Sequence, residues 1–79
     1  MTEDYSIIFY AVSKFGNLHT LGQFFTDKKE NVNCLINKGK KQFGIHLRTT
    51  DNMRVFVLDE DGNTLADYTF EPSECKERI

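Results

Sequence analysis

The 79-residue sequence has no tryptophan, one proline, two cysteines and no long apolar run. A membrane-spanning helix needs about 20 mostly apolar residues, so the sequence predicts none. Small secreted domains held by disulfides use four or more cysteines, and Cys34 and Cys75 therefore predict reduced thiols. The first residues are acidic, whereas a secretory signal peptide begins with basic residues. We therefore expect a cytoplasmic protein that does not enter a membrane.

The side chains that most often form metal and catalytic sites are few. Zinc sites draw on three or four closely spaced Cys or His ligands, and here these residues are dispersed. Gly62 follows three acidic residues as in a calcium loop, but the loop's first and twelfth positions would be Val57 and Tyr68, which supply no carboxylate. No glycine-rich phosphate loop and no G-x-S-x-G motif is present. We expect no cofactor, no metal and no catalytic residue. The dispersed Cys and His residues are Cys34, Cys75, His19 and His46.

Aromatic residues are plentiful for so short a chain, with seven Phe and three Tyr. Rings bury much apolar area for each residue that folding orders, which helps a small core. The length and the absence of linkers or repeats predict a single domain over residues 1–72. Residues 73–79 are predicted to form a polar C-terminal tail.

Residues 53–70 give the strongest structural signal. Two runs rich in β-branched and aromatic residues flank the turn sequence Asp-Glu-Asp-Gly-Asn at residues 59–63, which predicts a β-hairpin. Gly62 or Asn63 can take positive φ at little cost, and the side chain of Asp59 or Asp61 can hydrogen-bond back to the turn backbone.

The N-terminal part predicts a second hairpin. Residues 5–13 are apolar on both alternating faces, as in a central strand that is covered on both sides. Gly16-Asn17 supplies turn chemistry, and residues 18–25 return as a strand. Gly22 marks a bulge or a close backbone approach.

The next segment predicts one short helix. Asp27 is the expected N-cap, and Gly39 is the expected end of the helix in the left-handed conformation. An apolar stripe at helical spacing would face the sheet. It consists of Val32, Leu35, Ile36 and Gly39.

Residues 42–48 alternate, with Phe43, Ile45 and Leu47 on one side, and this predicts a half-buried strand. The element order is then ββαβββ. The fold class is α+β, a single small domain with one helix packed on a mostly antiparallel sheet.

The segment Lys41-Gln-Phe-Gly-Ile-His-Leu47 resembles part of the consensus of the RNA-recognition-motif family, in which a basic residue precedes an aromatic-Gly run on a strand. Residues 8–12 would stand for the companion aromatic strand. The resemblance implies bases stacked on exposed rings. It covers about seven residues, and that family alternates βαββαβ, whereas a strand is predicted here in place of the first helix. Phe43 is expected to face the core, on the same side as Ile45 and Leu47.

The formal net charge of −2 conceals two oppositely charged segments. Residues 27–54 carry seven basic and three acidic side chains, and residues 55–79 carry seven acidic and two basic ones. Such a distribution can steer a charged partner or a second copy. It is also compatible with ordinary solvated surfaces that neutralise each other after folding. The residues expected to bind a protein partner are those of the acidic hairpin, Asp59, Glu60, Asp61 and Asp67. The residues expected to contact nucleic acid are Lys38, Lys40, Lys41, His46, Arg48 and Arg54.

We interpret the sequence as that of a small non-enzymatic interaction protein that binds and modulates a macromolecular partner, most directly another protein. The abundance of Lys, Asn, Ile and Phe suggests a bacteriophage or low-GC bacterial regulator or inhibitor. One alternative is a single-stranded nucleic-acid-binding module that uses the basic segment 38–54. The other is a homodimeric structural protein in which the acidic C-terminal half docks on the basic segment of a second copy.

Overall fold

The computed structural model describes residues 4–48 and 50–75, and within them it confirms an α+β domain with one main helix packed on an antiparallel sheet. No helix among the described residues is long and apolar enough to cross a membrane. The elements in chain order are β1 (Tyr5–Val12), β2 (Leu18–Thr26), the 3₁₀ turn η1 (Lys29–Asn31), α1 (Val32–Gly44), β3 (Asn52–Leu58), β4 (Thr64–Phe70) and the short α2 (Pro72–Cys75).

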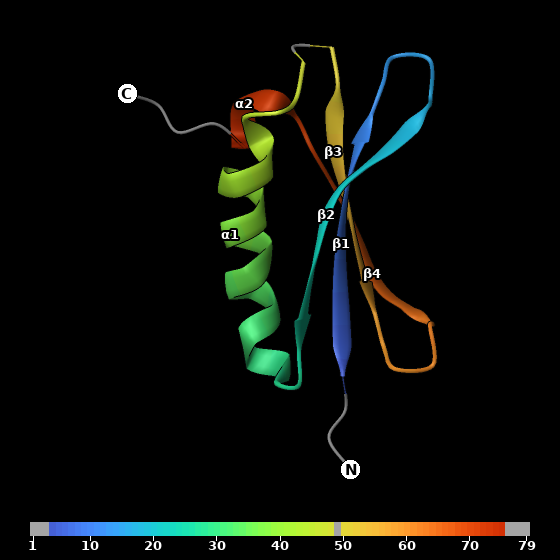
Figure 1. Cartoon of the computed structure of the whole chain (residues 1–79), viewed down its shortest axis with the longest axis vertical. Helices are drawn as coiled ribbons and strands as arrows, with labels where there is room; N and C mark the ends of the chain where they lie inside the picture. Colours follow the sequence, from blue (N-terminus) through green and yellow to red (C-terminus); the bar gives the residue numbers. More distant parts are fainter. Residues whose placement is uncertain (1–3, 49, 76–79) are drawn as a thin grey trace.

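The four described strands form one sheet in the order β2-β1-β3-β4, and every neighbouring pair is antiparallel. Figure 1 shows α1 running along one side of this twisted sheet. The helix packs against β1, β2 and β3, and α2 packs against α1 and β3. We call the sheet face beneath α1 the inner face and the opposite one the outer face.

Both predicted hairpins are confirmed, because their turn residues adopt the conformations that the sequence indicated. Gly16 has φ of 85° between β1 and β2, and Gly62 has φ of 86° between β3 and β4. Each turn is closed by backbone hydrogen bonds, from Gly16 N–H to the Ser13 carbonyl at 2.9 Å and from Gly62 N–H to the Asp59 carbonyl at 3.1 Å. The ladder between β1 and β2 contains a bulge next to Gly22, as expected.

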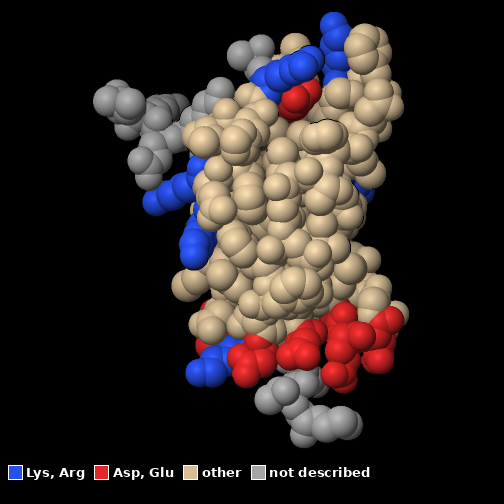
Figure 2. All heavy atoms as spheres, in the orientation of Figure 1, with Lys and Arg blue, Asp and Glu red and all other residues tan. Residues whose placement is uncertain are grey.

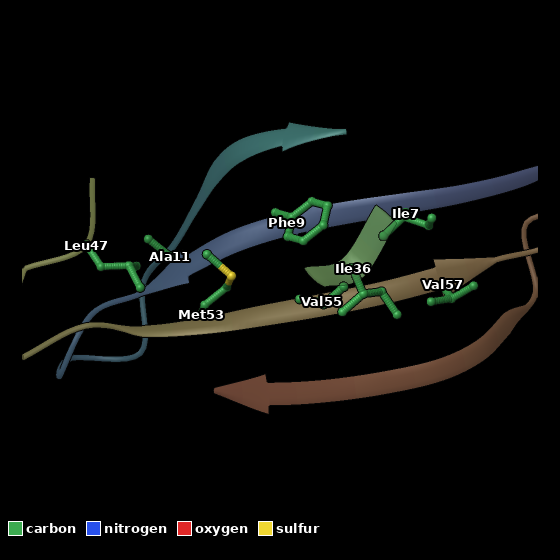
Figure 3. Close-up of a cluster of buried hydrophobic side chains, with 8 residues drawn as sticks. All are labelled: Ile7, Phe9, Ala11, Ile36, Leu47, Met53, Val55 and Val57. Carbon is green, nitrogen blue, oxygen red and sulfur yellow. The ribbon is translucent and has the colours of Figure 1, made fainter. Parts of the chain in front are cut away.

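The core lies between α1 and the inner face (Figure 3). Alternate residues of the two central strands supply most of it, since every second side chain of a strand points to the same face. Around this cluster, the Phe9 ring contacts the rings of Phe24 and Phe43 at centroid distances of 5.5 and 5.2 Å. The buried cluster is Ile7, Phe9, Ala11, Ile36, Leu47, Met53, Val55 and Val57.

The predicted start of the helix is wrong in detail. Asp27 does not cap it; the 3₁₀ turn η1 precedes α1, and Asn31 occupies the N-cap position without a side-chain hydrogen bond. The Thr26 hydroxyl instead accepts a hydrogen bond from Lys28 N–H at 3.2 Å and organises the turn after β2. The apolar stripe is confirmed, since Ile36 and Gly39 are buried.

The predicted strand over residues 42–48 is also wrong, and the order is ββαββ followed by α2. The helix does not end at Gly39 but continues to Gly44. Gly39 is a helical residue whose missing side chain makes room for the Phe9 ring, which a Cβ would overlap. Phe43 packs on the core from the last turn of α1, because it lies on the same helical stripe as Ile36 and Gly39. Ile45 is exposed, and Leu47 is buried within a loop.

Candidate protein-binding surface

The outer face of the sheet is rich in apolar side chains, and no described helix covers it. Its outward positions follow from the register, which pairs Ile8 with Phe56 and Val12 with Leu18. The outward apolar side chains of the neighbouring strands β1 and β3 are half-buried. On β2, Leu18 and Phe25 are 54% and 68% exposed. We call this set the outer patch: Ile8, Tyr10, Val12, Leu18, Phe25, Phe56 and Leu58.

An outer face of this composition is unusual for an antiparallel sheet with one face toward water. Such strands normally alternate between apolar inner and polar outer positions. Here β1 presents Ile8, Tyr10 and Val12 outward, although its inner positions already fill the core. The sequence predicted a strand covered on both sides, and the described chain covers one. The outer patch is therefore an apolar surface that the described elements leave uncovered.

Aromatic and charged groups meet at the middle of the outer patch. The rings of Tyr10 and Phe56 contact edge to face at a centroid distance of 5.5 Å. The Arg54 guanidinium lies over the Phe56 ring, 4.9 Å from its centroid. Arg54 also donates two hydrogen bonds to the Asp67 carboxylate, from Nε at 3.2 Å and from Nη2 at 2.8 Å. This fork holds the aromatic pair and the ion pair in one fixed arrangement.

The ion pair explains the charge states of its two members. Hydrogen bonds from Arg54 lower the pKa of Asp67 below the usual carboxylate value, and the attraction of the guanidinium adds to the effect. The same hydrogen bonds raise the pKa of Arg54. The structure thus separates Asp67 from the rest of the predicted acidic site, since Asp67 lies on the outer face and is neutralised there.

The other predicted acidic residues lie in the turn between β3 and β4 and have different roles. Asp59 accepts hydrogen bonds from the backbone N–H of Asn63 at 2.8 Å and of Asp61 at 3.0 Å. The bond from Asn63 N–H lowers the pKa of Asp59, with further bonds from the Asn63 side chain and Asp61 N–H. Asp59 is therefore a turn-stabilising residue. Glu60 and Asp61 are exposed and remain available to a partner.

The six predicted nucleic-acid residues do not form one surface. Lys38 and Lys40 lie on α1, over the rings of Phe24 and Phe70, with Lys40 Nζ 4.0 Å from the ring centroid. Lys41 also belongs to α1, whereas Arg54 is on the outer face. His46 and Arg48, together with Asp51 and residues of the β1–β2 turn, line a hollow of about 620 Å³. The same hollow is lined by His19 and by Phe15, which is 79% exposed.

Charges are distributed unequally between the two ends of the molecule. Figure 2 shows acidic side chains gathered at the end where the β3–β4 turn lies, and basic ones at the opposite end and along the α1 side. Among the described residues, the acidic end has six acidic and two basic ones, a balance of −4: Asp4, Asp27, Glu30, Asp59, Glu60, Asp61, Lys28 and Lys29. Among the residues whose side chains are described, the basic end has four basic and two acidic ones, a balance of +2: Lys14, Lys40, Lys41, Arg48, Asp51 and Glu71.

The resemblance to the RNA-recognition motif does not hold in the fold. Lys41 to Gly44 belong to the last turn of α1, so that no aromatic strand exists there. The outer aromatic pair comes instead from Tyr10, within the segment 8–12 compared with the companion strand, and from Phe56, which lies outside both compared segments. The available signal was the apolar character of both faces of residues 5–13.

No group of three or more metal-binding side chains occurs in the described part of the chain. Cys34 is a free thiol on the surface of α1. Comparisons of the sequence with protein-family models and curated proteins, and of the structure with solved structures, find no match.

Proposed function

We propose that the protein is a non-enzymatic protein-binding domain and that the outer patch is its docking surface. The observation that carries the proposal is the apolar outward side of the central strands β1 and β3, which no described element covers. Docking would remove Phe25 and Leu18 from water, and each apolar side chain that becomes buried contributes roughly 1.5–3 kcal/mol before the costs of association. A domain of this kind acts by occupying a surface, as a regulator or inhibitor does.

Charged groups beside the apolar side chains of the outer patch and at the acidic end supply specificity. The paired Arg54 and Asp67 leave some hydrogen-bonding capacity for a partner, and Glu60 and Asp61 add negative charge at one end. Charges at the rim of an interface mainly set the association rate and suppress wrong partners. The apolar centre would then provide most of the affinity, and the charged groups would set the orientation of the bound partner.

A photo-crosslinking amino acid at position 25 tests the proposal in cells that express the protein naturally. Benzoylphenylalanine replaces an exposed Phe25 conservatively, and the same residue at Ile45, which is 72% exposed and lies beyond α1, is the matched control. We expect a defined covalent adduct from position 25 and none of the same mass from position 45. Absence of an adduct at position 25, or equal adducts at both positions, would refute the outer patch as the docking surface.

A second candidate function, binding of single-stranded nucleic acid, is favoured by the hollow at the basic end. Its exposed Phe15 ring offers a stacking surface, and Arg48 with Lys14 nearby offers positive charge. Fluorescence anisotropy with a mixed-sequence oligonucleotide should then show binding that weakens steeply with salt and is lost in Arg48→Glu but retained in Lys28→Glu. Salt-independent binding, or none at low salt, would eliminate this candidate.

A further inference from the structure

The outer patch has the size and the charge surroundings that suit a second copy of the same chain. We infer that two copies stack their outer sheet faces in a two-fold symmetric dimer, with α1 of each copy on the outside. This inference rests on the proposed function, because it identifies the protein that docks on the outer patch. The product would be two sheets packed face to face between two layers of helix, an arrangement that buries both sides of β1 and β3.

The area of the outer face is sufficient for a reversible dimer. A strand of eight residues such as β1 is about 27 Å long at roughly 3.4 Å per residue. Four strands about 4.8 Å apart make the sheet about 19 Å wide. The face therefore offers about 500 Å² per copy, or about 1,000 Å² in the dimer, at the lower limit of specific interfaces. We expect micromolar affinity and a reversible equilibrium between monomer and dimer.

With the strands of the two sheets aligned, two symmetric arrangements bring identical faces together, and they differ in which ends meet. In a closed two-fold dimer the same patch is used by both copies. If the two-fold axis runs along the strands, like ends meet, and the acidic end with its balance of −4 lies opposite another −4. If the axis runs across the strands, the acidic end lies opposite the basic end with its balance of +2.

Electrostatics favours the second arrangement. Opposite net charges at facing ends attract, whereas like charges repel and also reduce the rate of encounter. The turn residues Glu60 and Asp61 of one copy would then lie at the basic end of the other copy, on the side where β3 begins and β4 ends. The distribution of charge between the two ends thus selects the antiparallel orientation of the sheets.

The charged groups of the outer face are compatible with this burial. Arg54 and Asp67 are joined within one copy by two hydrogen bonds, so neither charge would enter the interface unpaired. Burial of an unpaired charge would strongly oppose association, whereas a paired and hydrogen-bonded charge opposes it far less. The Tyr10 and Phe56 rings beside this pair provide the aromatic centre that protein interfaces favour.

Sedimentation velocity on the purified protein, from about 1 µM to about 500 µM, tests the inference across the affinity range expected for so small an interface. We expect a reversible shift from monomer to dimer. Phe25→Glu places a charge in the patch at an exposed position and should raise the dissociation constant by at least about tenfold. Ile45→Glu makes the same type of change at an exposed site away from the outer face and should leave the constant unchanged. Circular dichroism verifies that both variants are folded.

Reversal of charge at Glu60 and Asp61 then distinguishes the two arrangements. The double variant Glu60→Lys with Asp61→Lys brings the balance of the acidic end from −4 to neutral. The antiparallel arrangement predicts a weaker dimer at low salt and a smaller difference at about 0.5 M salt, where charges are screened. A tighter dimer would contradict it, since removal of like-charge repulsion strengthens the parallel arrangement. Asp59 is left unchanged because its carboxylate holds the turn.

The failure of this inference is distinguishable from that of the proposed function. A wild-type protein that stays monomeric at the highest concentration, or a Phe25→Glu variant that dimerises as the wild type does, overturns the dimer. If the crosslink at position 25 still joins a different protein, the docking surface stands with another occupant. If neither a dimer nor an adduct forms, both proposals fail.

Discussion

Replacement of Gly39 by alanine should destabilise the protein, although alanine is the better helix former. Gly39 lies in the middle of α1, where alanine would contribute about 1 kcal/mol through helix propensity alone. A Cβ at this position would overlap two atoms of the Phe9 ring and would lie 2.6 Å from a third, Cε1. Optimal carbon–carbon separations are about 3.5–4.0 Å, so the overlap must be relieved by movement.

The Phe9 ring has little freedom to move. It is fully buried, and the rings of Phe24 and Phe43 hold it at centroid distances of 5.5 and 5.2 Å. Overpacking of a filled core costs roughly 1–3 kcal/mol, and three close ring atoms place Gly39→Ala near the upper value. After subtraction of the gain in propensity of about 1 kcal/mol, the net loss is about 2 kcal/mol. A chain of 79 residues has a total stability of roughly 4–12 kcal/mol.

Urea unfolding measures this loss of stability. Far-ultraviolet circular dichroism monitors the transition, because the chain has no tryptophan whose fluorescence could report on it. With a slope of about 1 kcal/mol per molar urea, the midpoint should fall by about 2 M. Asn37→Ala, at an exposed position of the same helix, is the control and should raise stability by a few tenths of a kcal/mol. In a Phe9→Leu background the penalty of Gly39→Ala should shrink. A Gly39→Ala variant about 1 kcal/mol more stable than the wild type would refute the packing argument.

Two further predictions concern the turn of the second hairpin and the carboxylates. Gly62→Ala should lower the free energy of unfolding by about 1 kcal/mol, because φ is 86° at this position and the space around it is open. Gly62→Asn should cost less, since Asn tolerates this backbone conformation. Equal losses for the two variants in urea unfolding would contradict the conformational cause. The folded-state pKa values of Asp59 and Asp67 are lowered, so their stabilisation is complete above the ordinary carboxylate pKa of about 4 and is lost as pH falls through the lowered values. Thermal unfolding from neutral to strongly acidic pH should therefore show a smaller loss of stability in the double variant Asp59→Asn with Asp67→Asn, and an unchanged profile would contradict this assignment.

Local chemistry made the hairpins predictable from the sequence. The turn around Gly62 needs positive φ and a side-chain acceptor, and both are encoded within five residues. The apolar stripe of the helix was equally visible in the sequence, but the position where the helix ends was not. Glycine is the residue type that most often ends a helix, which made Gly39 the expected end. Its role is instead to make room for the ring of Phe9, a residue 30 positions away in the sequence. The alternation of Phe43, Ile45 and Leu47 was then assigned to a strand, although Phe43 continues the helical stripe.

The candidate site was less accessible to sequence reasoning for the same reason. The acidic turn was recognised, but the assignment of Asp67 to it could not anticipate the ion pair with Arg54 on a neighbouring strand. The outer patch joins residues of three strands, and its membership depends on the register of β1 with β2 and β3. The sequence did show that residues 5–12 are apolar on both faces, which is the property that now points to a partner.

Carbon–proton correlation spectra of the methyl groups, recorded during serial dilution of the purified protein, test the central claim most directly. The outward-facing methyls of Ile8, Val12 and Leu58 report on the outer patch, those of Val55 on the core, and that of Ile45 on an exposed site elsewhere. If a second copy covers the outer patch, the three outward-facing residues shift with concentration and Ile45 does not. Concentration-dependent shifts at Ile45 alone, or invariant spectra throughout, would contradict the dimer formed by the outer faces.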